Sequence, residues 1–187
     1  NDALPLMQRL RERLHDVSRA LGRTPRVCVL GAGGRCGASA VVAARSLGVG
    51  DVATWGRADT ASRTEPDEGI PELLDFDVVI NAVRLPSSSR DSRDLAPMFL
   101  TNRLLQRVPA SERKLAVLCD ISADTFSPNN PLPFYTERTT FAKPVRRVSD
   151  VDVIAIPVLA ALVPRESSAS FSAQLLPHLL ALRAPSA

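Results

Sequence analysis

The sequence predicts an α/β fold of the Rossmann type, in which helices flank a doubly wound parallel sheet. Three observations lead to this prediction. A short apolar segment, 26–30, runs into the glycine-rich turn 31–37, and a helical segment follows. Further short apolar segments then alternate with helical or loop segments. Right-handed crossovers between parallel strands limit such a chain to a Rossmann-like topology. Its 187 residues are enough for one domain, 1–187, with a sizeable core.

The first expected element is a helix over 3–21, because Leu10, Leu14 and Val17 recur at helical spacing and Gly22 can end it. The last is an amphipathic helix over 166–182, with its apolar residues aligned on one face. Strands are expected at 26–30, 51–55, 77–81, 115–120 and 152–156. Between them we expect helices at 35–47 and 94–108, the second capped by Asp94, a helical turn at 70–74, and loops at 58–69, 86–93 and 126–133.

The turn after the first strand has the features of a phosphate-binding corner. Gly31, Gly34 and Gly37 are spaced as G-x-x-G-x-x-G, and Gly33 is an additional glycine. Glycines let the backbone approach a pyrophosphate, and the helix that begins here offers free N–H groups and a positive dipole end. Arg35 can add a positive charge or remain solvated at the helix start. The alternative is a plain glycine-rich turn without a ligand.

Ligands of open α/β sheets bind beyond the carboxyl ends of the strands. These ends define one expected rim for a nicotinamide dinucleotide. Cys36 belongs to this rim by its position, although we interpret its side chain as a small packing residue. The cofactor-binding candidates at this rim are Gly31, Gly33, Gly34, Arg35, Cys36, Gly56, Arg57, Asn81, Ala82, Asp120, Ile121 and Ser122.

The end of the second strand lacks the acidic residue that usually accepts from the ribose hydroxyls of NAD. Gly56 and Arg57 follow Trp55 instead, with Arg63 nearby, and Asp59 is the only close carboxylate. An arginine here suits a 2′-phosphate, which makes NADP an alternative to NAD. Alternatively, Arg57 is a loop residue whose side chain is solvated and binds no ligand.

Asp120 is the catalytic candidate. With Ser122 and Asp124 it ends the fourth strand, where carboxylates and a hydroxyl can position a substrate amine or a cofactor amide. The same residue types also cap turns, so a purely structural role is the alternative.

Composition argues against several other functions. The net charge is only +3, without a basic stripe interleaved with aromatics, so nucleic acid is not an expected partner. Two histidines and three scattered cysteines predict no metal site, and no apolar run is long enough to cross a membrane. The odd cysteine count favours a reducing compartment, the cytoplasm first, with the peroxisome left open.

With these pieces placed, the chain resembles the lysine-forming, NAD-dependent saccharopine dehydrogenases. The resemblance covers about 26–180 and is carried by five stretches. These are GAGGRCG at 31–37, VIN at 79–81, CDISADT at 119–125, PNNPLPFY at 128–135 and LVPRESS at 162–168.

The resemblance implies a two-domain enzyme that oxidises saccharopine with NAD and releases lysine and 2-oxoglutarate. It implies that this chain is a fragment holding the second, dinucleotide-binding domain, with a small-molecule, amino-acid-derived substrate as partner. The Lys and His that do the acid–base chemistry would lie on a missing N-terminal domain. The chain departs from the family pattern on the rim, at Gly56, 82–85 and 157–161. A pseudoenzyme or dinucleotide-binding module without catalysis is therefore the alternative.

Overall fold

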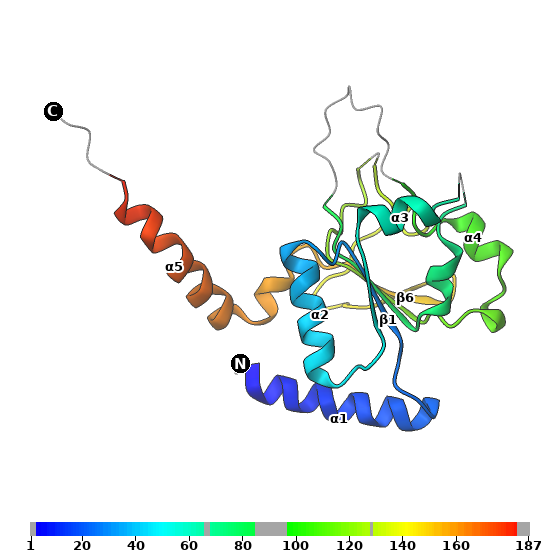
Figure 1. The fold of residues 1–187 in the computed structure, drawn as a ribbon, viewed down its shortest axis with the longest axis horizontal. Coiled ribbons are helices and arrows are strands. Elements are labelled where there is room, and N and C mark those ends of the chain that lie inside the picture. Colours follow the sequence, from blue (N-terminus) through cyan, green and yellow to red (C-terminus); the bar gives the residue numbers. More distant parts are fainter. Residues whose placement is uncertain (1–2, 66–67, 85–96, 128, 183–187) are drawn as a thin grey trace.

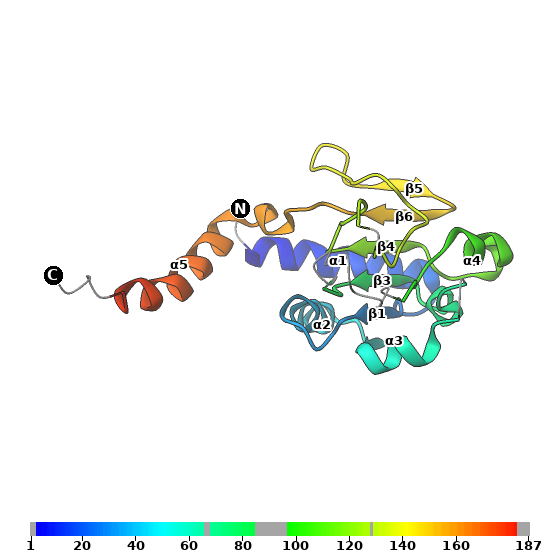
Figure 2. The same cartoon turned by 90° about the horizontal axis from the view of Figure 1, so that it is seen from above.

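The computed structural model describes residues 3–65, 68–84, 97–127 and 129–182. Within them, six strands form one sheet in the order β2-β1-β3-β4-β6-β5. All neighbours pair in parallel except β5, which is antiparallel to β6 (Figure 2). The Rossmann-like prediction is confirmed, with one antiparallel edge strand added. The strands are β1 (Val27–Leu30), β2 (Val52–Trp55), β3 (Val78–Asn81), β4 (Val117–Asp120), β5 (Arg146–Val148) and β6 (Val151–Ile154).

The two faces of the sheet are covered differently. Alternate residues of β1 point to opposite faces, so Cys28 and Leu30 belong to the larger apolar cluster and Val27 and Val29 to the smaller one. The smaller cluster is closed by α2, which contributes Val41 and other apolar side chains. The larger cluster is filled by residues of the loops and short helices between β2 and β4, and by Leu132, Phe134 and Tyr135 from the segment after β4. The helices are α1 (Ala3–Leu21), α2 (Arg35–Leu47), α3 (Arg57–Arg63), α4 (Asn102–Arg107) and α5 (Pro164–Leu180).

The first helix lies at the amino ends of the strands, below the sheet in Figure 1. Arg11 donates to the carbonyl oxygen of Ser46 at the end of α2, at 3.0 Å. After the helix ends, Arg23 makes a two-pronged bond to the Asp77 carboxylate, with N–O distances of 2.7 and 2.8 Å. This hydrogen bond, together with the positive charge of Arg23, holds the pKa of the Asp77 carboxyl below its usual value. The opposite ends of the strands therefore remain clear of α1.

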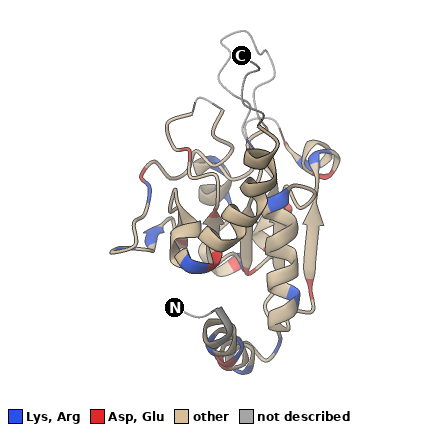
Figure 3. Cartoon of the chain, turned by 90° about the vertical axis from the view of Figure 1, so that its left-hand side faces the viewer, with Lys and Arg blue, Asp and Glu red and all other residues tan. Residues whose placement is uncertain are grey.

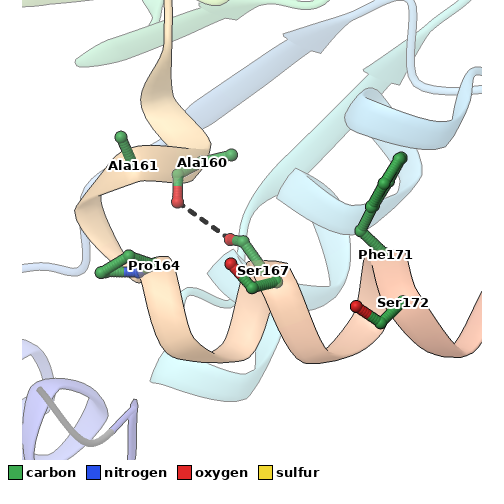
Figure 4. Close-up of a pocket in the computed structure, with 7 residues that line it drawn as sticks. Ala160, Ala161, Pro164, Ser167, Phe171 and Ser172 are labelled. Atoms are coloured by element: carbon green, nitrogen blue, oxygen red, sulfur yellow. Dashed lines mark hydrogen bonds between the residues drawn. The ribbon is translucent and has the colours of Figure 1, made fainter.

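The last helix forms where it was expected, but its apolar face is not buried by the described residues. Figures 1 and 2 show α5 projecting away from the sheet. Phe171 is 66% exposed and Leu179 is 51% exposed. A pocket of about 680 Å³ lies where the chain turns into α5 (Figure 4). There Ser167 donates to the carbonyl oxygen of Ala160 at 2.9 Å.

Two local predictions were wrong, and one strand was missed. Segment 58–69 is not all loop, because α3 occupies its first part. Only Asn102–Arg107 of the expected helix 94–108 is helical among the described residues, with Thr101 as its cap, and the proposed cap Asp94 lies outside them. The expected loop 86–93 also lies outside them. The strand β5 was not predicted, since it is short and largely polar.

Candidate functional site

The strand ends meet at one level, because the pairing register aligns them. Leu30 at the end of β1 pairs with Trp55 of β2 and with Asn81 of β3, and Asn81 pairs with Asp120 of β4. The residue that follows each of these strand ends is thus brought to a common edge. This edge contains the segments in which the sequence placed its cofactor-binding candidates.

Gly31 is fixed by the backbone around it. Its φ is +75°, in the left-handed region that favours glycine, and its amide donates to the carbonyl oxygen of Trp55 at 2.8 Å. A Cβ atom at residue 31 would lie 2.8 Å from the carbonyl oxygen of Ala82. Only a glycine lets the end of β1 pass this close to the end of β3.

The rest of the turn delivers α2 to the same edge. Gly34 caps the helix without a side-chain hydrogen bond, and a Cβ at Gly37 would lie 2.7 Å from the carbonyl carbon of Gly31. A Cβ at Gly33 would have no atom within 4 Å, so open space lies beside it. The first N–H groups of a helix have no partner inside it. The turn therefore combines free donors with room for a ligand.

A pocket of about 430 Å³ adjoins the turn and reaches the end of β2. Gly33 and Gly56 lie at its two sides, and Ala38, Val42 and Thr54 also line it. Its lining is small and apolar, apart from the threonine. In Rossmann folds this position, between the glycine turn and the second strand, is where the adenosine half of a dinucleotide binds.

The carboxylate nearest to the position of the missing acid, Asp59, lies in the first turn of α3 and is engaged by protein groups. Gly56 caps α3, and its amide donates to the Asp59 carboxylate at 2.8 Å. Arg63 donates to the Asp59 carbonyl oxygen at 2.9 Å, and its guanidinium lies 4.8 Å from the centre of the Trp55 ring. The carbonyl oxygen of Arg57 accepts from the Thr60 hydroxyl at 3.1 Å, but its guanidinium, exposed on the first turn, makes no hydrogen bond or ion pair with a described residue. Of the two arginines, Arg57 is the one left available to a ligand.

Asp120 is buried and its carboxylate is fully engaged. It is 1% exposed, and Asn81 Nδ2 donates to its Oδ1 at 2.8 Å. The Ser122 amide donates to the same oxygen at 3.0 Å, and the Tyr135 hydroxyl donates to Oδ2. This arrangement favours the structural reading of Asp120, in which it holds the ends of β3 and β4 together.

Tyr135 is the member of this network that sequence reasoning did not single out. Its side chain is buried and its hydroxyl donates to Asp120. Burial, followed by the nearby Asp120 charge, raises the pKa of Tyr135 above its ordinary value. The hydroxyl therefore stays a donor at neutral pH. The sequence signal was its place at the end of the stretch PNNPLPFY, but no local spacing connected it to Asp120.

Among the described residues, the other cysteines and acidic side chains form no second site. Cys36 is exposed at the start of α2, whereas burial raises the pKa of Cys28 to about 12 and that of Cys119 to about 11. No group of His, Cys, Asp and Glu suited to a metal occurs in the described part of the chain. None of its described helices is long and apolar enough to span a membrane. On the face shown in Figure 3, basic and acidic residues of the described chain are interspersed.

Comparison with known proteins finds relatives that match most of this chain. No protein-family model matches the chain. The saccharopine dehydrogenase (NAD(+), L-lysine-forming) of Neurospora crassa is 43% identical over 173 residues, which cover 87% of this chain and 42% of that protein. The enzyme of the same name from Emericella nidulans is 36% identical, covering 95% and 47%. Most of this chain is thus similar to one part of the lysine-forming saccharopine dehydrogenases.

The match is confined to part of the relatives. This chain spans less than half the length of the saccharopine dehydrogenases it matches, and the same holds for the relative from Schizosaccharomyces pombe, at 42%. A solved L-alanine dehydrogenase superposes with a TM-score of 0.53 and 16% identity, over 83% of this chain and 43% of that one. At this identity the superposition supports the fold alone.

Proposed function

We propose that the chain is the nicotinamide dinucleotide-binding domain of an oxidoreductase related to the saccharopine dehydrogenases. The glycine turn carries this proposal, because it joins free helix N–H groups to open space at Gly33 and to the pocket beside β2. The bound nicotinamide would supply the hydride transfer, while the chain binds and orients it.

Each part of the rim is assigned one part of the dinucleotide. The amides of Gly33, Arg35 and Cys36 would bind the pyrophosphate, next to the turn that Gly31 and Gly34 close through the hydrogen bond from the Gly34 amide to the Gly31 carbonyl oxygen, at 3.0 Å. Gly56 and Arg57 would meet the adenosine ribose. Asn81, Ala82, Asp120, Ile121 and Ser122 would form the nicotinamide end of the site. In this assignment Asp120 is a positioning residue, because both of its carboxylate oxygens accept from protein donors.

We infer that the cofactor is NAD, as in the names of the relatives, and that NADP is discriminated against less strongly than usual. Residue 56 carries no carboxylate to repel a 2′-phosphate, and Arg57 is free to pair with one. Asp59 has the carboxylate nearest to this position, and that carboxylate already accepts from the Gly56 amide. A single charge-assisted hydrogen bond is worth about 1.5–3 kcal/mol.

The substrate that fits this assignment is saccharopine, whose secondary amine would be oxidised before release of lysine and 2-oxoglutarate. Catalysis would require groups from a further domain. Across the described strand ends, the rim carries no lysine or histidine that can relay a proton. We assign those groups to the part of the relatives that this chain does not match.

The lack of a lysine or histidine on the described rim also favours a second candidate function, a dinucleotide-binding module without catalysis. Departures from the family pattern gather on the rim, at Gly56, 82–85 and 157–161, whereas the glycine turn and the Asp120 network are intact. Identification of a partner domain with a Lys and a His facing this rim would favour the enzyme.

Calorimetric titration of the chain with NAD and NADP tests the proposal, with Gly56→Asp and its uncharged match Gly56→Asn as variants. The φ of Gly56, −95°, suits any residue, and a new Cβ would lie 3.7 Å from Asp59 Oδ2. Gly56→Asp should raise the NAD-to-NADP affinity ratio about tenfold or more, as expected for one charged contact. A native chain that binds neither dinucleotide refutes the proposal. A native hundredfold preference for NAD, or an unchanged ratio in Gly56→Asp, refutes the inference about residue 56.

A further inference from the structure

The loop that follows β4 contains a backbone conformation that its own sequence does not favour. Ala123 has a φ of +45°, in the left-handed region, and its side chain is completely buried. An L-residue with a Cβ seldom adopts this conformation outside glycine-like turns. Such a conformation persists only where surrounding contacts hold it.

Arg138 makes those contacts, from 15 residues further along the chain. Its Nε donates to the carbonyl oxygen of Ala123 at 2.5 Å. Its Nη2 lies 3.7 Å from Asp124 Oδ1, and its guanidinium carbon lies 5.3 Å from the centre of the Phe126 ring. One planar cation thus engages three of the four residues 123–126.

The arginine is mounted on a fixed piece of backbone. The amide of the next residue, Thr139, donates to the carbonyl oxygen of Ala155 at 3.0 Å. The Ala155 amide donates in turn to Thr139 Oγ1 at 2.8 Å, and Thr139 is buried. Because Ala155 directly follows β6, the guanidinium of Arg138 is held in place relative to the sheet.

The other side of the same loop forms part of the rim. Ser122 Oγ donates to the carbonyl oxygen of Val83 at 2.6 Å, and the Ile121 amide donates to the carbonyl oxygen of Asn81 at 2.9 Å. Ala123 directly follows these two residues, so its conformation and these hydrogen bonds together set the path of Ile121 and Ser122 at the end of β4.

We propose that Arg138 is a positioning residue of the dinucleotide site. By holding Ala123 in its left-handed conformation, it keeps residues 121–123 in the path that presents the nicotinamide end of the rim. This inference rests on the proposed function of the rim. The arginine does not touch the ligand itself, since its guanidinium contacts are with the loop.

The test compares Arg138→Met and Arg138→Lys with the native chain, alone and combined with Ala123→Gly. Two quantities are measured: NAD affinity by calorimetry, and hydrogen exchange of amides 121–126 without ligand. Arg138→Met should weaken NAD binding roughly five- to tenfold, the order expected for one lost hydrogen bond, and speed exchange in the loop. Arg138→Lys should behave like Arg138→Met, because lysine keeps the charge but lacks the planar Nε donor.

The NAD affinity of the double variant, Arg138→Met with Ala123→Gly, distinguishes a positioning role of the arginine from a merely structural one. Glycine adopts a positive φ without steric cost, so it should restore most of the NAD affinity of Arg138→Met. Unchanged NAD affinity in Arg138→Met, or no restoration by Ala123→Gly, would overturn the proposal. If Arg138→Lys binds as the native chain does, charge alone is responsible and the proposal is wrong. If the native chain binds no dinucleotide although its loop is protected from exchange, the proposed function fails and the positioning role falls with it.

Discussion

Replacing Gly34 with aspartate separates the phosphate-binding role of the turn from its role in the fold. Gly34 has φ −81° and ψ 165°, an extended conformation open to any residue, and it caps α2 without a side-chain bond. Aspartate is a preferred N-cap and improves on glycine by a few tenths of a kcal/mol. Its Cβ would lie 3.3 Å from the carbonyl oxygen of Gly31, a tight contact that offsets part of this gain. We expect the free energy of unfolding to change by less than about 0.5 kcal/mol.

The effect on dinucleotide binding should be far larger. The new carboxylate would accept from the helix N–H groups that a pyrophosphate needs, and would place a negative charge about 4 Å from it. At an effective dielectric constant near 20, this repulsion amounts to about 4 kcal/mol, or an approximately thousandfold loss of affinity. Gly34→Asn is the matched control, because it competes for the same donors without the charge. It should lose only about tenfold.

Calorimetric titration of the three proteins with NAD, together with thermal unfolding, measures both effects. The difference between Gly34→Asp and Gly34→Asn should shrink as salt is added, since ions screen exposed charges. Equal NAD affinity in the native protein and in Gly34→Asp would mean that the turn is not a phosphate site. Equal losses in the two variants would mean that the turn excludes the added side chain and that charge is irrelevant.

Three further predictions concern catalysis and stability. The isolated chain should not turn over saccharopine with NAD, and a rate of about 1 per second or more would refute the assignment of acid–base groups to another domain. Tyr135→Phe should cost about 2 kcal/mol in unfolding free energy, because the buried Asp120 carboxylate loses a donor; chemical denaturation measures this, and a neutral result would contradict it. Asp77→Asn should lower the melting temperature at pH 7. Since Arg23 depresses the Asp77 pKa in the folded state, this stabilisation is present above the unfolded value near 4 and is lost as the pH falls through the folded value, so the two melting temperatures should converge in acid.

The sequence alone determined the parts of the fold that depend on local patterns. Short apolar runs predicted the five parallel strands to within two residues, because a strand covered on both faces needs continuous apolar side chains. The glycine spacing predicted the turn at 31–37 for a steric reason that the structure reproduces at Gly31 and Gly37. The predicted strand ends likewise placed the candidate residues at one edge of the sheet, since parallel strands end at one edge.

Only the tertiary structure decided the elements whose hydrogen bonds come from distant segments. Residues 97–101 had helical signals, but the Phe99 amide donates to the carbonyl oxygen of Pro131 at 2.7 Å, and Leu100 bridges to Gly69, so the helix begins only at Asn102. Polar β5 exists because it pairs with β6.

The same reason explains what the sequence left open at the site. Local spacing could not choose between a catalytic and a structural Asp120, because its donors come from Asn81, 39 residues before it, and Tyr135, 15 residues after it. Local spacing also could not decide whether Arg57 or Arg63 is available to a ligand. The Trp55 ring contacts the Arg63 guanidinium only after α3 has packed next to β2. A contact between residues far apart in sequence leaves no periodic signal, and the folded chain alone brings its partners together.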